Sequence, residues 1–222
     1  MTSTKRVKKK RLKEDQLVTF TVRASQFIQQ YFTQVIVGIV VLVVAVGAVL
    51  VTSYVRKNSA RDSEKEFALA MSQYNMRDLA TAATSFARIA DKYGSQSAGE
   101  VSRYFLGKTL LAQGKPEEAL EAFEQYISKG GAQAPFAAAA AIGKASSMEA
   151  LHNYVGAADV LERLSQTLDP EDPRYLEVLF QAGRNYEKAG SKDKASELYS
   201  AVGAKATGPL KDRVTVSLSL LQ

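Results

Sequence analysis

Cysteine and tryptophan are absent from the 222-residue sequence, and histidine occurs once, at His152. Without cysteine the chain has no disulfide framework and no thiolate chemistry. One histidine leaves little material for a histidine-ligated metal site or for a nucleophile that depends on a histidine base. A Gly-rich phosphate loop is also missing from the sequence. We therefore predict a protein that is not an enzyme and that uses no cofactor and no metal.

The excess of basic charge is confined to the N-terminus. Residues 1–34 carry eight Lys or Arg side chains against Glu14 and Asp15, which accounts for the whole net charge of +6. The remainder of the chain has equal numbers of basic and acidic residues. A basic folded face for nucleic acid is therefore not indicated.

A long apolar run follows this basic region. The stretch from Gln26 to Val55 carries no charge, and it contains the run VIVGIVVLVVAVGAVLV at residues 35–51. A helix over residues 35–55 would be about 31 Å long, close to the thickness of a bilayer core. We predict one transmembrane helix at residues 33–55. A cleavable signal peptide is the alternative, but the run is longer than usual and begins late.

The flanks of this run predict its orientation. The N-terminal flank is the more basic, which favours a cytoplasmic N-terminus and a location across the membrane for residues 56–222. Within residues 1–32, the basic stretch KRVKKKRLK precedes apolar residues at steps of three and four, Leu17, Phe20, Ala24, Phe27, Ile28 and Tyr31. This pattern is typical of an amphipathic helix on the inner leaflet. Ordinary flanking charge with a helical lead-in is the alternative.

One spacing recurs four times after the apolar run. A small residue is followed by Ala after 12 positions and by a large residue 4 positions later. The four sets are Ala70, Ala82 and Phe86; Gly107, Ala119 and Phe123; Ala145, Ala157 and Leu161; and Gly183, Ala195 and Tyr199. The alanines lie 37, 38 and 38 residues apart, which indicates a repeat architecture.

The physical unit of this repeat is a helix hairpin. Small residues let the two helices approach closely, and the large residue fills the space one turn later. We therefore predict an all-α fold, with an α-solenoid of about four hairpins at residues 56–205 and a capping helix at 206–222. The inter-repeat loops are expected at residues 91–100, 128–135 and 167–175.

Particular residues are expected to form the turns. Gly114 and Gly190 occupy equivalent positions at which a left-handed residue would end the first helix of a hairpin. His152 takes that position in the third repeat, and we expect Asn153 beside it to adopt the left-handed conformation. The acidic DPEDP segment at 169–173 lacks the ligand spacing of a calcium loop and is predicted to be a turn.

These motifs resemble the tetratricopeptide repeat. The resemblance rests on Arg103-x2-Leu106-Gly107-x2-Leu110 with Ala119-x3-Phe123, and on Leu179-x2-Ala182-Gly183-x2-Tyr186 with Ala195-x3-Tyr199. It implies a groove, lined by the first helices of the hairpins, that holds a peptide. Mapping by repeat position predicts nine groove residues, Phe67, Met71, Tyr104, Lys108, Leu111, Ile142, Ser146, Phe180 and Arg184. The family's Lys and Asn clamp for a terminal carboxylate is not reproduced.

The whole layout resembles the bacterial YfgM-like family, the ancillary subunits of the SecYEG translocon. That resemblance implies a single-pass protein of the inner membrane with its repeats in the periplasm. The implied partners are translocon subunits, exported client proteins and periplasmic chaperones. An envelope-assembly or cell-division scaffold is an alternative, and so is a cytosol-facing import receptor of an organelle with the opposite topology.

Overall fold

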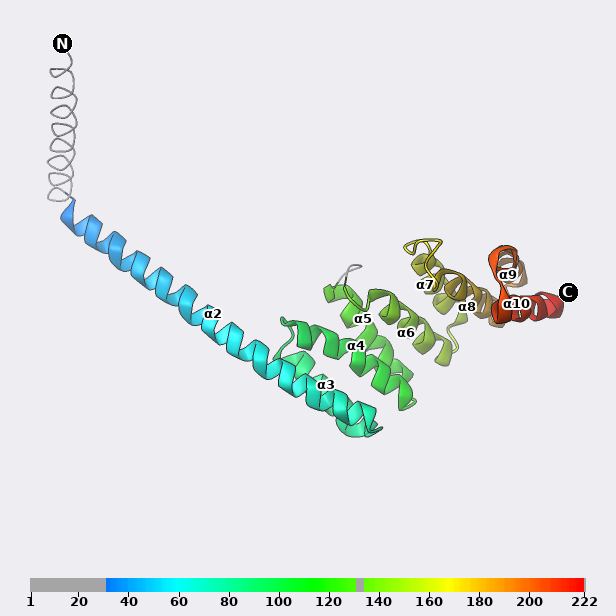
Figure 1. Ribbon diagram of the computed structural model, residues 1–222, viewed down its shortest axis with the longest axis horizontal. Coiled ribbons are helices and arrows are strands. Elements are labelled where there is room, and N and C mark those ends of the chain that lie inside the picture. The colour runs from blue at the N-terminus through cyan, green and yellow to red at the C-terminus, as the bar shows by residue number, and fades with distance from the viewer. Residues whose placement is uncertain (1–30, 131–133, 222) are drawn as a thin grey trace, which may run out of the picture. The chain divides into compact units, whose positions relative to one another are not determined.

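The computed structural model describes residues 31–130 and 134–221, and all regular structure in those two ranges is α-helical. The predicted all-α class is therefore confirmed. The basic tail and nearly all of the amphipathic lead-in lie outside the described residues. The helices in chain order (Figure 1) are α2 (Phe32–Asn75), α3 (Leu79–Lys92), α4 (Ser97–Ala112), α5 (Pro116–Gly130), α6 (Ala137–Ala150), α7 (Tyr154–Ser165), α8 (Tyr175–Lys188), α9 (Lys192–Lys205) and α10 (Gly208–Leu221).

The chain divides into two units, Met1–Asn58 and Ser59–Gln222. In the first unit, the large apolar side chains of α2 from Ile36 to Val55 are exposed. From Ile36 onward α2 is long and apolar enough to cross a membrane, by length and composition. The hydroxyls of Thr52 and Ser53 donate hydrogen bonds of 2.8 Å to the carbonyls of Ala48 and Leu50. These polar groups are thus satisfied within the helix, as an apolar surrounding requires.

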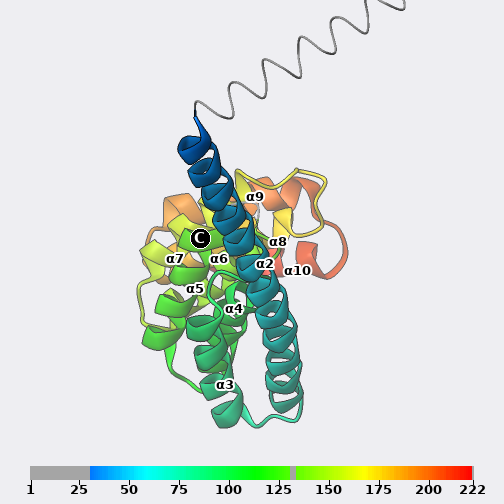
Figure 2. The same cartoon turned by 90° about the vertical axis from the view of Figure 1, so that its left-hand side faces the viewer.

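The second unit is a series of helix hairpins. Residues of α2 near its C-terminal end pack against α3, which folds back after a short turn at the lower end of Figure 2. The next hairpins are α4 with α5, α6 with α7, and α8 with α9, and each hairpin also packs against the following one. The last helix, α10, packs against α9 through the buried Val214.

The recurrent spacing marks the contact between the two helices of each hairpin. Ala70, Ala82 and Phe86 are fully buried together in one cluster. A Cβ atom built on Gly107 would lie 2.9 Å from the ring of Phe123, and one built on Gly183 would lie 2.9 Å from the ring of Tyr199. A methyl group does not fit at these two positions, so the prediction that small residues permit close helix approach is confirmed.

The turn inside every hairpin contains one residue with positive φ, at the same repeat position. The four residues are Arg77, Gly114, His152 and Gly190, with φ of 63°, 74°, 61° and 79°. The expectation that Asn153 adopts this conformation is wrong, because His152 itself does so. Asn153 instead caps α7, and its side chain accepts a hydrogen bond of 3.1 Å from the backbone N–H of Gly156.

The first inter-repeat loop is shorter than predicted, because α3 continues to Lys92 and α4 begins at Ser97. The guanidinium of Arg103, a residue only 5% exposed, stabilises this short connection. It donates to the carbonyls of Ala90, in the last turn of α3, at 2.9 Å and of Gly94, in the connection, at 3.3 Å. The DPEDP segment forms the predicted turn, in which the Asp169 carboxylate accepts from the backbone N–H of Glu171.

Candidate functional site

Four of the nine predicted groove residues line one pocket, which we call the α4–α6 groove. Its volume is about 460 Å³, and it lies between the first helices of the second and third repeats. The lining residues are Tyr104, Lys108, Leu111 and Ala112 of α4, Phe123 of α5, and Ala139, Ile142 and Gly143 of α6. The groove is therefore mainly apolar, with one amine and one phenol at its wall.

The other five predicted residues lie elsewhere in the repeat unit. Phe67 and Met71 pack at the edge of the first hydrophobic cluster, where the Phe67 ring centroid is 5.7 Å from that of Phe105. Phe180 is 3% exposed, and the guanidinium of Arg213 covers its ring at 4.3 Å. Ser146 is half-buried on α6. These residues do not join the α4–α6 groove.

Arg184, the ninth predicted residue, belongs to an ion-pair cluster between α6 and α8. Its guanidinium and the amine of Lys188 contact Glu149 at 2.8 and 2.6 Å. Burial tends to raise the pKa of Glu149, but hydrogen bonds from Lys188 and Arg184 outweigh it and hold that pKa below the ordinary value. The carboxylate stays charged at neutral pH and balances one of the two cations, so the cluster has a net charge of +1, two cations minus one carboxylate.

Lys108 differs from these basic residues because it faces aromatic rings instead of a carboxylate. Its Nζ atom lies 5.6 Å from the ring centroid of Tyr74, 5.7 Å from Tyr104 and 5.6 Å from Phe105. Among residues 31–130 and 134–221 it has no ion pair, whereas Lys144 on the next first helix contacts Glu124 at 2.8 Å. Burial raises the pKa of Tyr104, although Lys108 opposes this, so the phenol remains neutral.

Three lining residues of this groove, Ala112, Ala139 and Gly143, were not predicted from the repeat pattern. Gly143 lies against Phe123, and a Cβ atom built on it would be 2.4 Å from that ring. Ala139 lies one turn earlier on the same helix. Gly143 and Ala139 are four residues apart and therefore lie on one face of α6. This second spacing of small residues within the repeat is the sequence signal that could have identified them.

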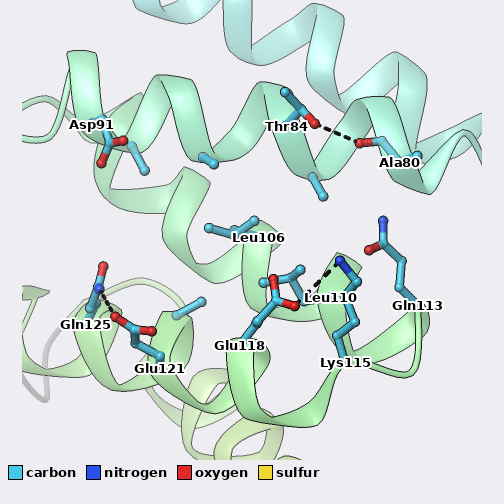
Figure 3. A pocket seen from close by; sticks show the side chains of 14 residues that line it. Ala80, Thr84, Asp91, Leu106, Leu110, Gln113, Lys115, Glu118, Glu121 and Gln125 are labelled. Atoms are coloured by element: carbon cyan, nitrogen blue, oxygen red, sulfur yellow. Dashed lines mark hydrogen bonds and ion pairs between the residues drawn. The ribbon is translucent and has the colours of Figure 1, made fainter.

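Two further pockets lie between the second helices of consecutive hairpins. The α3–α5 groove has a volume of about 780 Å³ and is drawn in Figure 3, with Leu106 and Leu110 of α4 between its two walls. The α5–α7 groove, of about 660 Å³, includes residues of α6 and Arg174 in its lining. The prediction from sequence considered only the first helices and therefore missed both. Within the described ranges, no group of three His, Asp or Glu residues is placed to hold a metal ion.

Comparison with known proteins supports the repeat assignment. The tetratricopeptide repeat family model matches residues 66–95 and 104–129. A Podosopora anserina protein whose TPR-like repeats are nearly identical to one another superposes on this chain with a TM-score of 0.60 at 20% sequence identity. The match covers 73% of this chain and 86% of that chain. MamA superposes with a TM-score of 0.59 at 18% identity, covering 72% of this chain and 80% of MamA. No match is found among curated proteins. The fold is thus that of a tetratricopeptide-like solenoid, and scaffolds of this repeat type typically bind proteins and are typically non-catalytic.

Proposed function

We propose that this chain is a non-enzymatic, membrane-anchored scaffold that binds segments of partner proteins in the α4–α6 groove. The observation that carries this proposal is the apolar groove with the amine of Lys108 at its wall, which lies over aromatic rings and has no ion pair among the described residues. A partner segment would place an aliphatic or aromatic side chain against the partly exposed Leu111, Ala139 and Ile142. Lys108 would then hydrogen-bond to a carbonyl or carboxylate of the same segment.

The proposed site of action is the protein-export translocon in the bacterial inner membrane. The exposed apolar part of α2 suits a single membrane anchor, because its side chains are apolar around the whole helix. The basic N-terminal flank favours a cytoplasmic N-terminus and periplasmic repeats. The resemblance to translocon-associated repeat proteins suggests translocon subunits, exported clients or periplasmic chaperones as partners. Under this proposal the membrane contacts are the anchor and the basic tail, and nucleic acid is not a partner.

Topology is the first test, and the absence of cysteine makes it simple. Single cysteines replace Ser3 and Ser97 in separate variants, and intact cells are treated with a membrane-impermeant thiol reagent. Labelling at position 97 alone would support the proposed orientation. Labelling at position 3 alone would overturn it and favour the cytosol-facing import receptor.

Crosslinking then tests the groove itself. A photo-reactive phenylalanine analogue replaces Ile142 in the groove or, as the control, Val155, which is 50% exposed on α7. We expect adducts with translocon subunits or exported precursors at position 142 and not at 155. Adducts confined to envelope-assembly or division proteins would favour the alternative scaffold. Equal adducts at both positions would contradict the use of this groove.

A further inference from the structure

Helix α4 presents opposite faces to two different grooves. Successive residues of a helix are rotated by about 100°, so Leu106 and Leu110 lie roughly half a turn away from Tyr104, Lys108 and Leu111. The second set lines the α4–α6 groove, and the first set lines the α3–α5 groove. Occupation of one groove therefore leaves the other accessible.

The α3–α5 groove is wide because its α3 wall is built from small side chains. Ala80, Ala83 and Ala87 follow each other at steps of three and four, which places them on one face of α3. The opposite wall is formed by α5, and Figure 3 shows Leu106 and Leu110 between the two walls. Because alanine side chains are short, this wall leaves room for large apolar side chains of a partner protein.

The two ends of this groove differ in charge. At one end, Lys115 contacts Glu118 at 3.5 Å, and the Gln113 side chain donates to the Leu79 carbonyl at 2.6 Å. At the other end, Asp91 of α3 and Glu121 of α5 stand on opposite walls, as Figure 3 shows. Neither carboxylate has an ion-pair partner in the described part of the chain. This end therefore carries unbalanced negative charge.

The neighbouring α5–α7 groove provides an internal contrast. It has a similar volume, yet its charged lining residues are Lys144, Arg163 and Arg174. Both grooves arise from the same repeat geometry, so geometry alone does not set their charge. Lys144 pairs with Glu124 and Arg174 with Asp172, so within the described residues Arg163 is the unpaired charge of this lining, and its sign is opposite to that of Asp91 and Glu121. The opposite signs predict opposite preferences for a charged partner.

We propose that the α3–α5 groove binds an amphipathic helix of a partner protein. Two large apolar side chains of that helix would pack against the partly exposed Ala83, Ala87 and Leu106, and a Lys or Arg about one turn further on would lie between Asp91 and Glu121. The partner segment is helical because the groove walls are helices without free backbone groups to pair with an extended chain, whereas a helix satisfies its own backbone. This surface is separate from the α4–α6 groove and extends the proposed function.

The test uses the full chain in nanodiscs of phosphatidylcholine, with empty nanodiscs as the background. The probes are two fluorescent helix-forming peptides of about 16 residues, with leucines at i and i+4. One peptide carries two lysines about one turn beyond the leucines, and the other carries glutamates there. Fluorescence anisotropy measures binding. We expect the lysine peptide to bind with a Kd of roughly 50 µM or tighter, and the glutamate peptide to bind at least about fivefold more weakly.

Charge-reversal variants then locate the binding. The double variant D91K/E121K should weaken binding of the lysine peptide about tenfold and improve binding of the glutamate peptide. The matched control D193K/E197K makes the same charge change on exposed positions of α9 and should leave both affinities within about twofold. Lys108→Gln reports on the other groove: it removes the amine proposed to bind a carboxylate there, so any effect of it should fall on the glutamate peptide and not on the lysine peptide.

Three results would overturn this proposal. They are no binding of the lysine peptide, equal binding of both peptides, and equal weakening by D91K/E121K and D193K/E197K. A circular dichroism melt of each variant checks that the fold is retained. A loss of binding caused by Lys108→Gln alone would place the peptide in the α4–α6 groove, which would support the proposed function while refuting the second site.

Discussion

The α4–α5 and α6–α7 hairpins have the same arrangement but reach it with different residues. In the first hairpin, Gly107 faces the flat ring of Phe123, and Gly114 takes the positive φ of the turn. In the second hairpin, Ala145 packs with Leu161 in one cluster, and His152 takes the positive φ. A smaller residue on the first helix is therefore matched by a larger residue on the second helix of the same hairpin. The positive φ of the turn does not require glycine.

The two hairpins also differ in how polar groups are satisfied. Arg103 on α4 is buried and bonds to carbonyls at the end of α3, whereas the residue one repeat later, Ala141, has no such side chain. Glu149 on α6 forms ion pairs with Arg184 and Lys188, whereas Lys108 on α4 has no carboxylate partner in the described ranges. Four substitutions test how much each of these differences contributes to the stability of the fold.

The largest effect is expected for Arg103→Ala. This change leaves the carbonyls of Ala90, Gly94 and Gly99 without the buried guanidinium that bonds to them. We expect a loss of about 3 kcal/mol in the free energy of unfolding. Thermal unfolding followed by circular dichroism measures it. Arg163→Ala is the control, because Arg163 is exposed, and a similar loss for both variants would contradict the role of Arg103.

Gly107→Ala should have the next largest effect. The added methyl group would lie 2.9 Å from the Phe123 ring, so the cost should be about 2 kcal/mol. If the pairing of small and large residues explains the difference between the hairpins, the same change should cost about 1 kcal/mol less in a Phe123→Leu background. A double-mutant cycle by urea denaturation provides the measurement, and strict additivity would refute the pairing.

Glu149→Gln should cost about 1 kcal/mol near neutral pH, because two cationic side chains lose their partner. The pKa of Glu149 in the folded protein lies below its unfolded value of 4.5. Its contribution is therefore present above pH 4.5 and is lost as the pH falls through the folded pKa. The stability difference between wild type and variant should shrink over that range in pH-dependent melts. A difference that stays constant with pH would argue against an ionic origin.

The smallest effect is expected for His152→Gly. Relief of the positive φ stabilises the turn, but glycine also increases the entropy of the unfolded chain, so the net gain should be about 0.5 kcal/mol. Gly114→Ala makes the opposite change in the other hairpin and should cost about 1 kcal/mol. Differential scanning calorimetry can resolve both. A destabilised His152→Gly would mean that the 2.7 Å contact between His152 and Tyr154 matters more than the backbone.

Much of the repeat fold was predictable because its signal is local and periodic. The triplet of Ala70, Ala82 and Phe86 predicted a buried contact that the structure confirms, and Gly114 and Gly190 predicted the turns. The prediction for the first inter-repeat loop was less accurate. Its short connection is held by Arg103, whose guanidinium bonds to a carbonyl 13 residues earlier in the chain. A pattern within one helix does not contain that information.

The candidate site was predicted only in part. Tyr104, Lys108, Leu111 and Ile142 share a groove because repeat position places them on facing first helices. Phe180 has the same type of position, yet Arg213 of α10 covers its ring. The α3–α5 groove was missed entirely, since it depends on the distance between two second helices that do not pack against each other.

The sequence by itself determined the apolar run, the hairpin repeat and the turn positions, because each depends on residue spacing along one segment. Only the tertiary structure decided which surfaces stay open and which charges stay unbalanced. Glu149 forms an ion pair with Arg184, which is 35 residues later in the chain, and Lys108 contacts three aromatic rings from two helices. These contacts depend on the packing of one repeat against the next, which the spacing within a repeat does not specify.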